Sequence, residues 1–180
     1  MRVLLAFLLL CAAAFGQAPS PYVAQMTSPV RGLSAQEVDD LLNGRGMGQA
    51  RMAELQSYPG PRHVIELKDK LGLSETAAAR VQASFGRMDE EARRLGREIV
   101  EQEKQLSAAF AAGTLTPAVL ASRGERLGRL YGRLRAVHLR AHLEVRPLLT
   151  AEQVARYNEL RGYTSAMPAS HQHDPSMHHD

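Results

Sequence analysis

Apolar residues recur at alternating steps of three and four along two long stretches of the chain. In the first, between Ser74 and Gly113, they are Val81, Phe85, Met88, Ala92, Leu95, Ile99, Leu106 and Phe110. In the second, which starts at Thr116, they are Leu120, Leu127, Leu130, Leu134, Val137, Ala141, Val145 and Leu148. This spacing predicts two long amphipathic helices. Because residues 113–116 leave only a short loop, the two helices are expected to pack antiparallel.

Shorter helices are predicted around this hairpin by cap and break signals. Ser34 with Glu37 and Thr150 with Gln153 are capping boxes that open helices over 34–43 and 150–161. A further short helix is predicted over 47–58. The Pro-Gly-Pro break at 59–61 then starts a helix over 61–71, with Pro61 at its first position.

These elements predict an all-α fold, with a long antiparallel helical hairpin, short N-terminal helices and a short C-terminal helix. A lone hairpin with narrow apolar stripes buries little surface, so we expect a symmetric homodimer or short helices folded back over the hairpin; a compact four-helix monomer is the alternative. Gly124, Gly128 and Gly132 recur at every fourth position and predict a close helix approach. The helical domain spans 34–163, after a flexible Pro-, Ser- and Gly-rich leader over 17–33.

The first residues are typical of an export signal. Arg2 precedes an unbroken apolar run over 3–15, which is too short to cross a bilayer, and Ala14-Phe15-Gly16 is a small-x-small cleavage pattern. The sequence therefore predicts a signal peptide over 1–16 and a periplasmic protein that starts at Gln17, with an uncleaved anchor as the alternative.

Composition excludes several classes of function. Basic and acidic residues number 22 and 19 and are interspersed, so no nucleic-acid surface is predicted. Cys11 is the only cysteine and lies in the predicted signal peptide, which excludes disulfides, zinc knuckles and a cysteine nucleophile from the mature chain. The sequence has no hydrolytic, nucleotide-binding or HExxH motif. We therefore expect no enzymatic activity.

Histidines are the residues that suggest chemistry. His138 and His142 are four apart on the second long helix, which places two imidazoles on one face, where they can share a metal ion. His63 follows the rigid Pro-Gly-Pro turn, and Glu66 is on the same face of its helix. If this segment packs on the hairpin, the four residues would suit divalent Zn, Ni, Co or Cu. The alternative for the pair is one histidine at the edge of the core, hydrogen-bonded to a carboxylate, and one exposed histidine. The alternative for the other two residues is a histidine in the first turn of its helix and a surface glutamate.

The C-terminal segment over 164–180 is a predicted disordered tail rich in histidine. Its histidines are His171, His173, His178 and His179. A histidine-rich segment of this kind is expected to form a secondary metal site. Its affinity should be weak, because binding must order a disordered segment at a cost in entropy. An expression tag is the alternative, although the interrupted spacing argues against it.

Leu149-Thr150-Ala151-Glu152-Gln153 matches the LTxxQ motif, and the chain resembles the periplasmic Spy/CpxP family over roughly residues 34–163. Leu73-Ser74-Glu75-Thr76-Ala77 resembles a first copy that has lost its glutamine. The resemblance implies an all-helical, hook- or cradle-shaped dimer without enzymatic activity. His138 and His142 match the His-x-x-x-His/Met pair of the heavy-metal sensor and resistance branch (CnrX/ZraP-like), and His63, Glu66 and, more weakly, Met47 are candidates for ligands from the first helices. The paired N-terminal histidines of that branch are missing.

The resemblance favours a heavy-metal-binding sensor or resistance protein of the envelope stress response. Its alternative is an ATP-independent chaperone that holds unfolded envelope proteins on a concave face. A membrane-bound signalling protein is a partner compatible with either function. Replacing His138 and His142 together should abolish a metal response and leave client holding intact.

Overall fold

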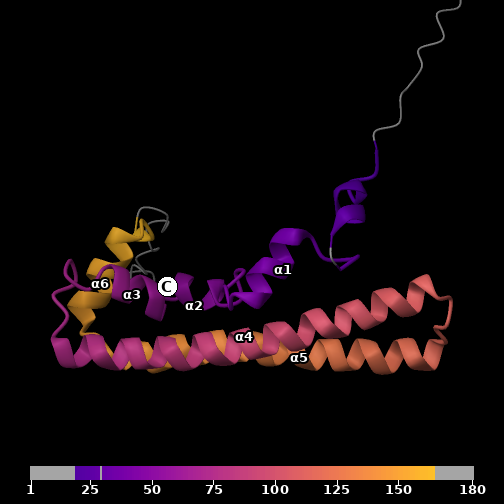
Figure 1. The fold of residues 1–180 in the computed structure, drawn as a ribbon. Helices are drawn as coiled ribbons and strands as arrows, with labels where there is room; N and C mark the ends of the chain where they lie inside the picture. The colour runs from indigo at the N-terminus through magenta and orange to yellow at the C-terminus, as the bar shows by residue number, and fades with distance from the viewer. Residues whose placement is uncertain (1–18, 29, 165–180) are drawn as a thin grey trace, which may run out of the picture.

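The computed structural model describes residues 19–28 and 30–164, and the regular structure in this part of the chain is helical, as predicted. The elements in order are η1 (Val23–Thr27), α1 (Ala35–Leu42), α2 (Arg51–Leu55), α3 (Pro61–Glu66), α4 (Glu75–Ala111), α5 (Pro117–Val145), η2 (Arg146–Leu148) and α6 (Ala151–Leu160). Figure 1 shows α4 and α5 as a long antiparallel hairpin, with α1, α2 and α3 along one side and α6 beside α3. The predicted signal peptide and the four tail histidines lie outside the described residues.

The two long helices begin where their cap residues predict. The Ser74 hydroxyl accepts the backbone N–H of Ala77 at 3.2 Å, and the Thr116 hydroxyl accepts that of Val119 at 3.3 Å. Pro117 occupies the first turn of α5, where its missing N–H has no helical acceptor to lose. Gly113, with φ +64°, lets the chain leave α4 and enter the loop.

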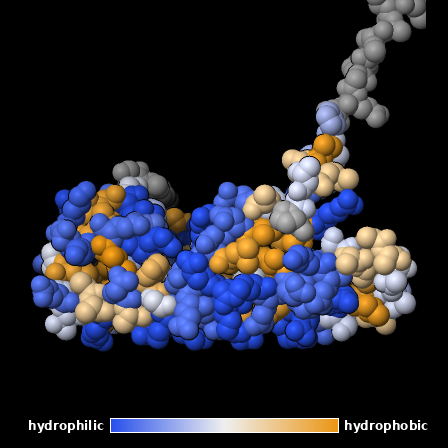
Figure 2. All heavy atoms as spheres, in the orientation of Figure 1, coloured by the Kyte–Doolittle hydropathy of each residue, from blue (hydrophilic) through white to orange (hydrophobic). Residues whose placement is uncertain are grey.

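The hydrophobic core consists of two clusters at different levels of the hairpin. The central cluster joins α1 and the residues before it to the middle of α4 and α5; its members include Val30, Leu33, Leu41, Met88, Leu95, Ile99, Leu130 and Leu134. The end cluster joins α3 and α6 to the open end of the hairpin; its members are Val64, Leu71, Val81, Val145, Leu149, Val154 and Tyr157. In Figure 2 apolar surface near α3 and α6 is separated by polar surface from the apolar surface near α1. The junction between the clusters is where the candidate site lies.

The LTxxQ residues fix α6 to the turn that precedes α4. Thr150 caps α6, and its backbone N–H donates to Oε1 of Gln153 at 3.0 Å, so the predicted capping box is present. The amide Nε2 of Gln153 then donates to the carbonyl oxygens of Leu71 and Gly72 at 3.2 and 3.3 Å. One glutamine therefore closes the start of α6 and satisfies two loop carbonyls that no helix pairs.

The predicted close approach at the glycine stripe of α5 is wrong within the described part of the chain. A Cβ added at Gly124, Gly128 or Gly132 would meet no described atom within 4 Å. The close approach occurs instead at Gly96 of α4, where an added Cβ would lie 1.9 Å from the carbonyl oxygen of Leu41. The stripe points away from α4, and the end of α1 crosses α4 at a glycine that carried no repeat signal.

Three other boundaries differ from the sequence-based expectation. Val30 and Leu33, inside the predicted leader, are buried in the central cluster. The helix predicted over 47–58 shortens to α2, because Met47 and Ser57 adopt positive φ angles of 46° and 60° at its two sides. The helix predicted over 61–71 ends at Glu66 and continues as turns.

At the tip of the hairpin the apolar stripe is only partly covered. Leu106 packs against the central cluster, whereas Phe110 is 62% exposed and Leu120 is 43% exposed. None of the helices that the structure describes is both long and apolar enough to cross a membrane.

Candidate metal-binding pocket

A pocket of about 410 Å³ lies between the hairpin and the segment that contains α2 and α3. All three histidines singled out in the described sequence line it: His63 from α3, and His138 and His142 from α5. Glu66 does not line it and is exposed on α3. The structure therefore brings His63, but not Glu66, into the pocket that His138 and His142 line, and the four-ligand set stays a prediction.

His142 is held with one ring nitrogen directed at a backbone carbonyl. Its Nδ1 lies 2.7 Å from the carbonyl oxygen of Tyr58, and because a carbonyl only accepts, Nδ1 carries the hydrogen. In the neutral ring Nε2 then keeps its lone pair. Gly60 allows the Pro-Gly-Pro turn to press against this imidazole, since a Cβ there would lie 2.9 Å from Cε1 of His142.

His63 is oriented in a similar way by a carboxylate. Its Nδ1 lies 3.3 Å from Oε1 of Glu54, and its side chain is partly exposed. The carboxylate accepts the Nδ1 hydrogen, which again leaves the lone pair on Nε2 of the neutral ring. A histidine whose Nδ1–H is held by a carboxylate or a carbonyl is the usual arrangement around a metal-binding Nε2.

Glu54 is a residue of the candidate site that no sequence pattern had indicated. Its carboxylate accepts hydrogen bonds from the hydroxyl of Tyr157 at 2.8 Å, the hydroxyl of Tyr163 at 3.3 Å and the backbone N–H of Gly60 at 3.2 Å, besides His63. Burial alone would raise the pKa of Glu54, but the hydrogen bonds from His63 and Tyr157, together with the charges of His142 and His63, lower the net pKa. The carboxylate is therefore ionised and joins α2, α3 and α6.

His138 is the most buried of the three histidines. Its side chain belongs to a residue only 3% exposed, and its Nε2 has no hydrogen-bond partner among the described residues. Burial, followed by the positive charges of His142 and Arg62, lowers the pKa of His138 to about 4. The ring is therefore neutral at physiological pH. Buried polar atoms in proteins nearly always have a hydrogen-bond partner, so the unpartnered Nε2 is an exception that needs an explanation.

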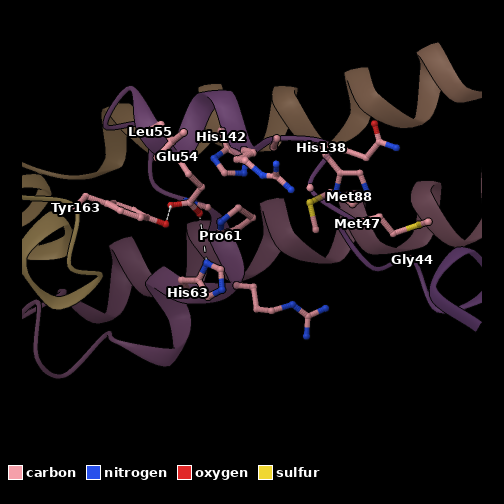
Figure 3. A pocket seen from close by; sticks show the side chains of 17 residues that line it. Gly44, Met47, Glu54, Leu55, Pro61, His63, Met88, His138, His142 and Tyr163 are labelled. Carbon is pink, nitrogen blue, oxygen red and sulfur yellow. Dashed lines mark hydrogen bonds and ion pairs between the residues drawn. The ribbon is translucent and has the colours of Figure 1, made fainter. Parts of the chain in front are cut away.

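The pocket has two ends of different chemistry, which Figure 3 shows side by side. Glu54, Tyr163 and His63 lie toward one end, and His138, Met88 and Met47 lie toward the other. Met88 is a member of the apolar stripe, and it packs in the central cluster while it also lines the pocket. No signal in the sequence distinguished it from the other stripe residues.

The three imidazoles line one pocket without forming a closed set of ligands. Within residues 19–28 and 30–164, no group of three or more His, Cys, Asp or Glu side chains is close enough together to hold one ion. An ion shared by His63, His138 and His142 would therefore draw the α2–α3 segment and the hairpin toward each other. Comparison of the chain with protein-family models, curated proteins and solved structures finds no match.

Proposed function

We propose that this chain is an exported, non-catalytic metal-binding protein of the heavy-metal sensor and resistance type, and that the pocket between α2–α3 and the hairpin is its site. The observation that carries the proposal is the meeting of His63, His138 and His142, from two distant parts of the sequence, in one pocket. Export and family membership rest on the N-terminal apolar run and the LTxxQ resemblance.

The donor set fits a transition-metal ion. His63 and His142 each use Nδ1–H for an acceptor of the protein, so each presents an Nε2 lone pair. His138 adds an Nε2 that is buried and has no partner in the described chain. Neutral imidazole nitrogens suit divalent Zn, Ni, Co and Cu, and pKa lowering keeps His138 free of the proton that would compete with the ion.

Metal binding would act on the arrangement of the short helices. Because the histidines are not yet close enough to share an ion, binding stabilises a state in which α3 has moved relative to α5. His63 is hydrogen-bonded to Glu54, and Glu54 holds Tyr157 of α6, so a shift of His63 reaches α6 through two hydrogen bonds. A partner that contacts α6 or the short helices would detect the ion by that change.

Calorimetric titration with Zn(II), Ni(II), Co(II) and Cu(II) tests the proposal. The titrations use a full-length reference variant, so that metal cannot bind to side chains outside the pocket. In this variant alanine replaces Cys11, His171, His173, His178 and His179. We expect binding of one ion per chain with micromolar or tighter affinity. Absence of binding, or binding that survives replacement of the pocket histidines, would refute the site.

Variants of the pocket separate loss of ligand from loss of fold. His138→Ala with His142→Ala should abolish binding, and far-UV circular dichroism shows whether the hairpin remains folded. His63→Ala changes a partly exposed side chain and should weaken binding without unfolding. Glu66→Ala is its matched control on the same helix, since Glu66 is exposed and does not line the pocket. Unchanged affinity is expected for this control.

A second function, an ATP-independent chaperone, is favoured by the exposed tip of the hairpin. Phe110 is 62% exposed, and Leu120, which belongs to the apolar stripe, is exposed together with its neighbour Val119. Apolar side chains that gather at one end of a soluble helix pair are suited to bind unfolded chains. In an aggregation-suppression assay, Phe110→Ser with Leu120→Ser should then reduce client holding, whereas Leu143→Ser, exposed elsewhere on α5, should not. Equal holding by all variants would exclude the tip as a client surface.

A further inference from the structure

The end of the pocket opposite Glu54 carries thioether sulfur in place of carboxylate oxygen. Met88 and Met47 line the pocket together with His138, and Figure 3 places the three side chains at the same end. Met88 comes from α4, His138 from α5 and Met47 from the loop before α2. Three separate segments of the fold therefore contribute two methionines and one histidine to the lining of the same end of the pocket.

His138 supplies the observation that points to a ligand at this end. The residue is only 3% exposed and its Nε2 has no partner among the described residues. Leaving a buried polar atom without a hydrogen bond destabilises a fold, so such atoms are uncommon unless something else binds them. The thioether groups of Met88 and Met47 line the same end of the pocket and are soft ligands for an ion bound there.

Met47 is held at the pocket by an unusual backbone conformation. Its φ is +46°, in the left-handed region that side chains other than glycine seldom adopt. Gly44 and Gly48 on either side also have positive φ, which lets the loop turn sharply around Met47. Strain of this kind is concentrated at functional sites, where the position of one side chain outweighs local stability.

The charged side chains that line this end of the pocket are arginines, although Asp89 lies near enough to act on His138. Among the described residues, Glu54 alone is acidic and lines the pocket, and its carboxylate is already engaged by His63 and Tyr157 at the other end. Arg51 and Arg62 also line the pocket and add positive charge. The thioether and imidazole donors are neutral and do not offset these two positive charges. The two guanidinium groups repel a doubly charged ion about twice as strongly as a singly charged one.

We propose that His138 Nε2, Met88 and Met47 form a site for a soft monovalent ion, Cu(I) under reducing conditions. Thioether and imidazole ligands select Cu(I) over hard divalent ions, and low coordination numbers need no carboxylate. The inference rests on the proposed metal-binding function, because the two donor sets share the pocket and His138. The inference adds a monovalent ion, and Met88 and Met47 as its ligands, to the proposed divalent-ion site.

Anaerobic competition with the chromogenic Cu(I) chelator bicinchoninate tests the site in the full-length reference variant, which has no thiol at position 11 and no tail histidines. We expect one Cu(I) per chain. Met88→Leu with Met47→Leu should weaken Cu(I) binding by more than ~10-fold, because leucine keeps the volume and removes the sulfur. Met52→Leu is the matched control, since Met52 is an exposed methionine of α2 that does not line the pocket, and should leave affinity unchanged.

X-ray absorption on the Cu(I)-loaded protein gives a second readout. Sulfur scatterers are expected in the first shell, and they should disappear in the double methionine variant. A first shell without sulfur, or unchanged Cu(I) affinity in that variant, would overturn the proposal, and binding of divalent ions in the same samples would leave the proposed function standing. If neither Cu(I) nor a divalent ion binds, both proposals fall.

A third variant, His63→Ala with His142→Ala, removes the two ligands that belong only to the proposed divalent-ion site. This variant should lose divalent-ion binding and keep Cu(I) binding within ~3-fold, because neither residue belongs to the sulfur-containing set. Loss of Cu(I) binding in this variant would show that the ion depends on His63 or His142 and would refute the assignment of its site to His138, Met88 and Met47.

Discussion

Acidification of the metal-free protein should destabilise it through His138. The folded state holds this ring neutral, with a pKa of about 4 against 6.5 for an ordinary histidine. Between these two values the unfolded chain binds a proton that the folded chain does not, so the free energy of unfolding falls as the pH falls. Burial is the main cause, and the charges of His142 and Arg62 add to it.

The size of the effect follows from the two pKa values. One pKa unit corresponds to ~1.36 kcal/mol, and lowering the pH from about 8 to about 5 spans most of the interval in which only the unfolded chain is protonated. The folded state should therefore lose about 2 kcal/mol through His138 in this range. Glu54, whose pKa is lowered, is stabilising above its unfolded value of 4.5, and that contribution is lost only at still lower pH.

Urea unfolding followed by far-UV circular dichroism, in the presence of a chelator, measures this quantity. His138→Leu removes the titrating group and keeps a side chain suited to a buried position. The difference in free energy of unfolding between this variant and the parent should grow by about 2 kcal/mol from about pH 8 to about pH 5. The other histidines are common to both proteins and cancel in this difference. If parent and variant keep the same difference across the range, His138 is not held neutral by burial.

Further predictions concern packing and hydrogen bonding. Gly96→Ala should lower thermal stability strongly, since its Cβ would lie 1.9 Å from a carbonyl oxygen of α1, whereas Gly128→Ala should be neutral or stabilise by up to ~1 kcal/mol through helix propensity; thermal melts of the pair compare the two helices directly. Tyr157→Phe removes a hydrogen bond to the ionised Glu54 and should destabilise by about 1–3 kcal/mol in urea titrations, and an unchanged midpoint would contradict the role of Glu54. Thr150→Ala removes the cap of α6 and should destabilise by ~1 kcal/mol, with hydrogen exchange increasing first in that helix.

Most of the helical framework could be predicted from the sequence because its signals are local. The caps at Ser34, Ser74, Thr116 and Thr150 each act within three residues, and each starts a helix in the structure. Periodicity located the middle of the hairpin for the same reason. The symmetric dimer depends on surfaces of two chains and stays a prediction.

The candidate site could be predicted only in part, because its remaining residues are joined by tertiary contacts. His138 and His142 have a local spacing, and the Pro-Gly-Pro turn marked His63. Glu54 meets Tyr157 across more than a hundred residues, and no local pattern reports such a pair. The same limit applies to the glycines: a repeat drew attention to α5, while the closest backbone approach depends on where α1 ends.

The division of the core has a consequence for how the molecule opens. The central cluster and the end cluster each bury their own side chains, and the pocket lies at the junction between them. Separation at this junction exposes the glycine-rich loop before α2 but leaves both clusters packed, so it requires much less free energy than global unfolding. Ions could therefore enter and leave by a local fluctuation, on a timescale set by the loop rather than by the stability of the whole fold.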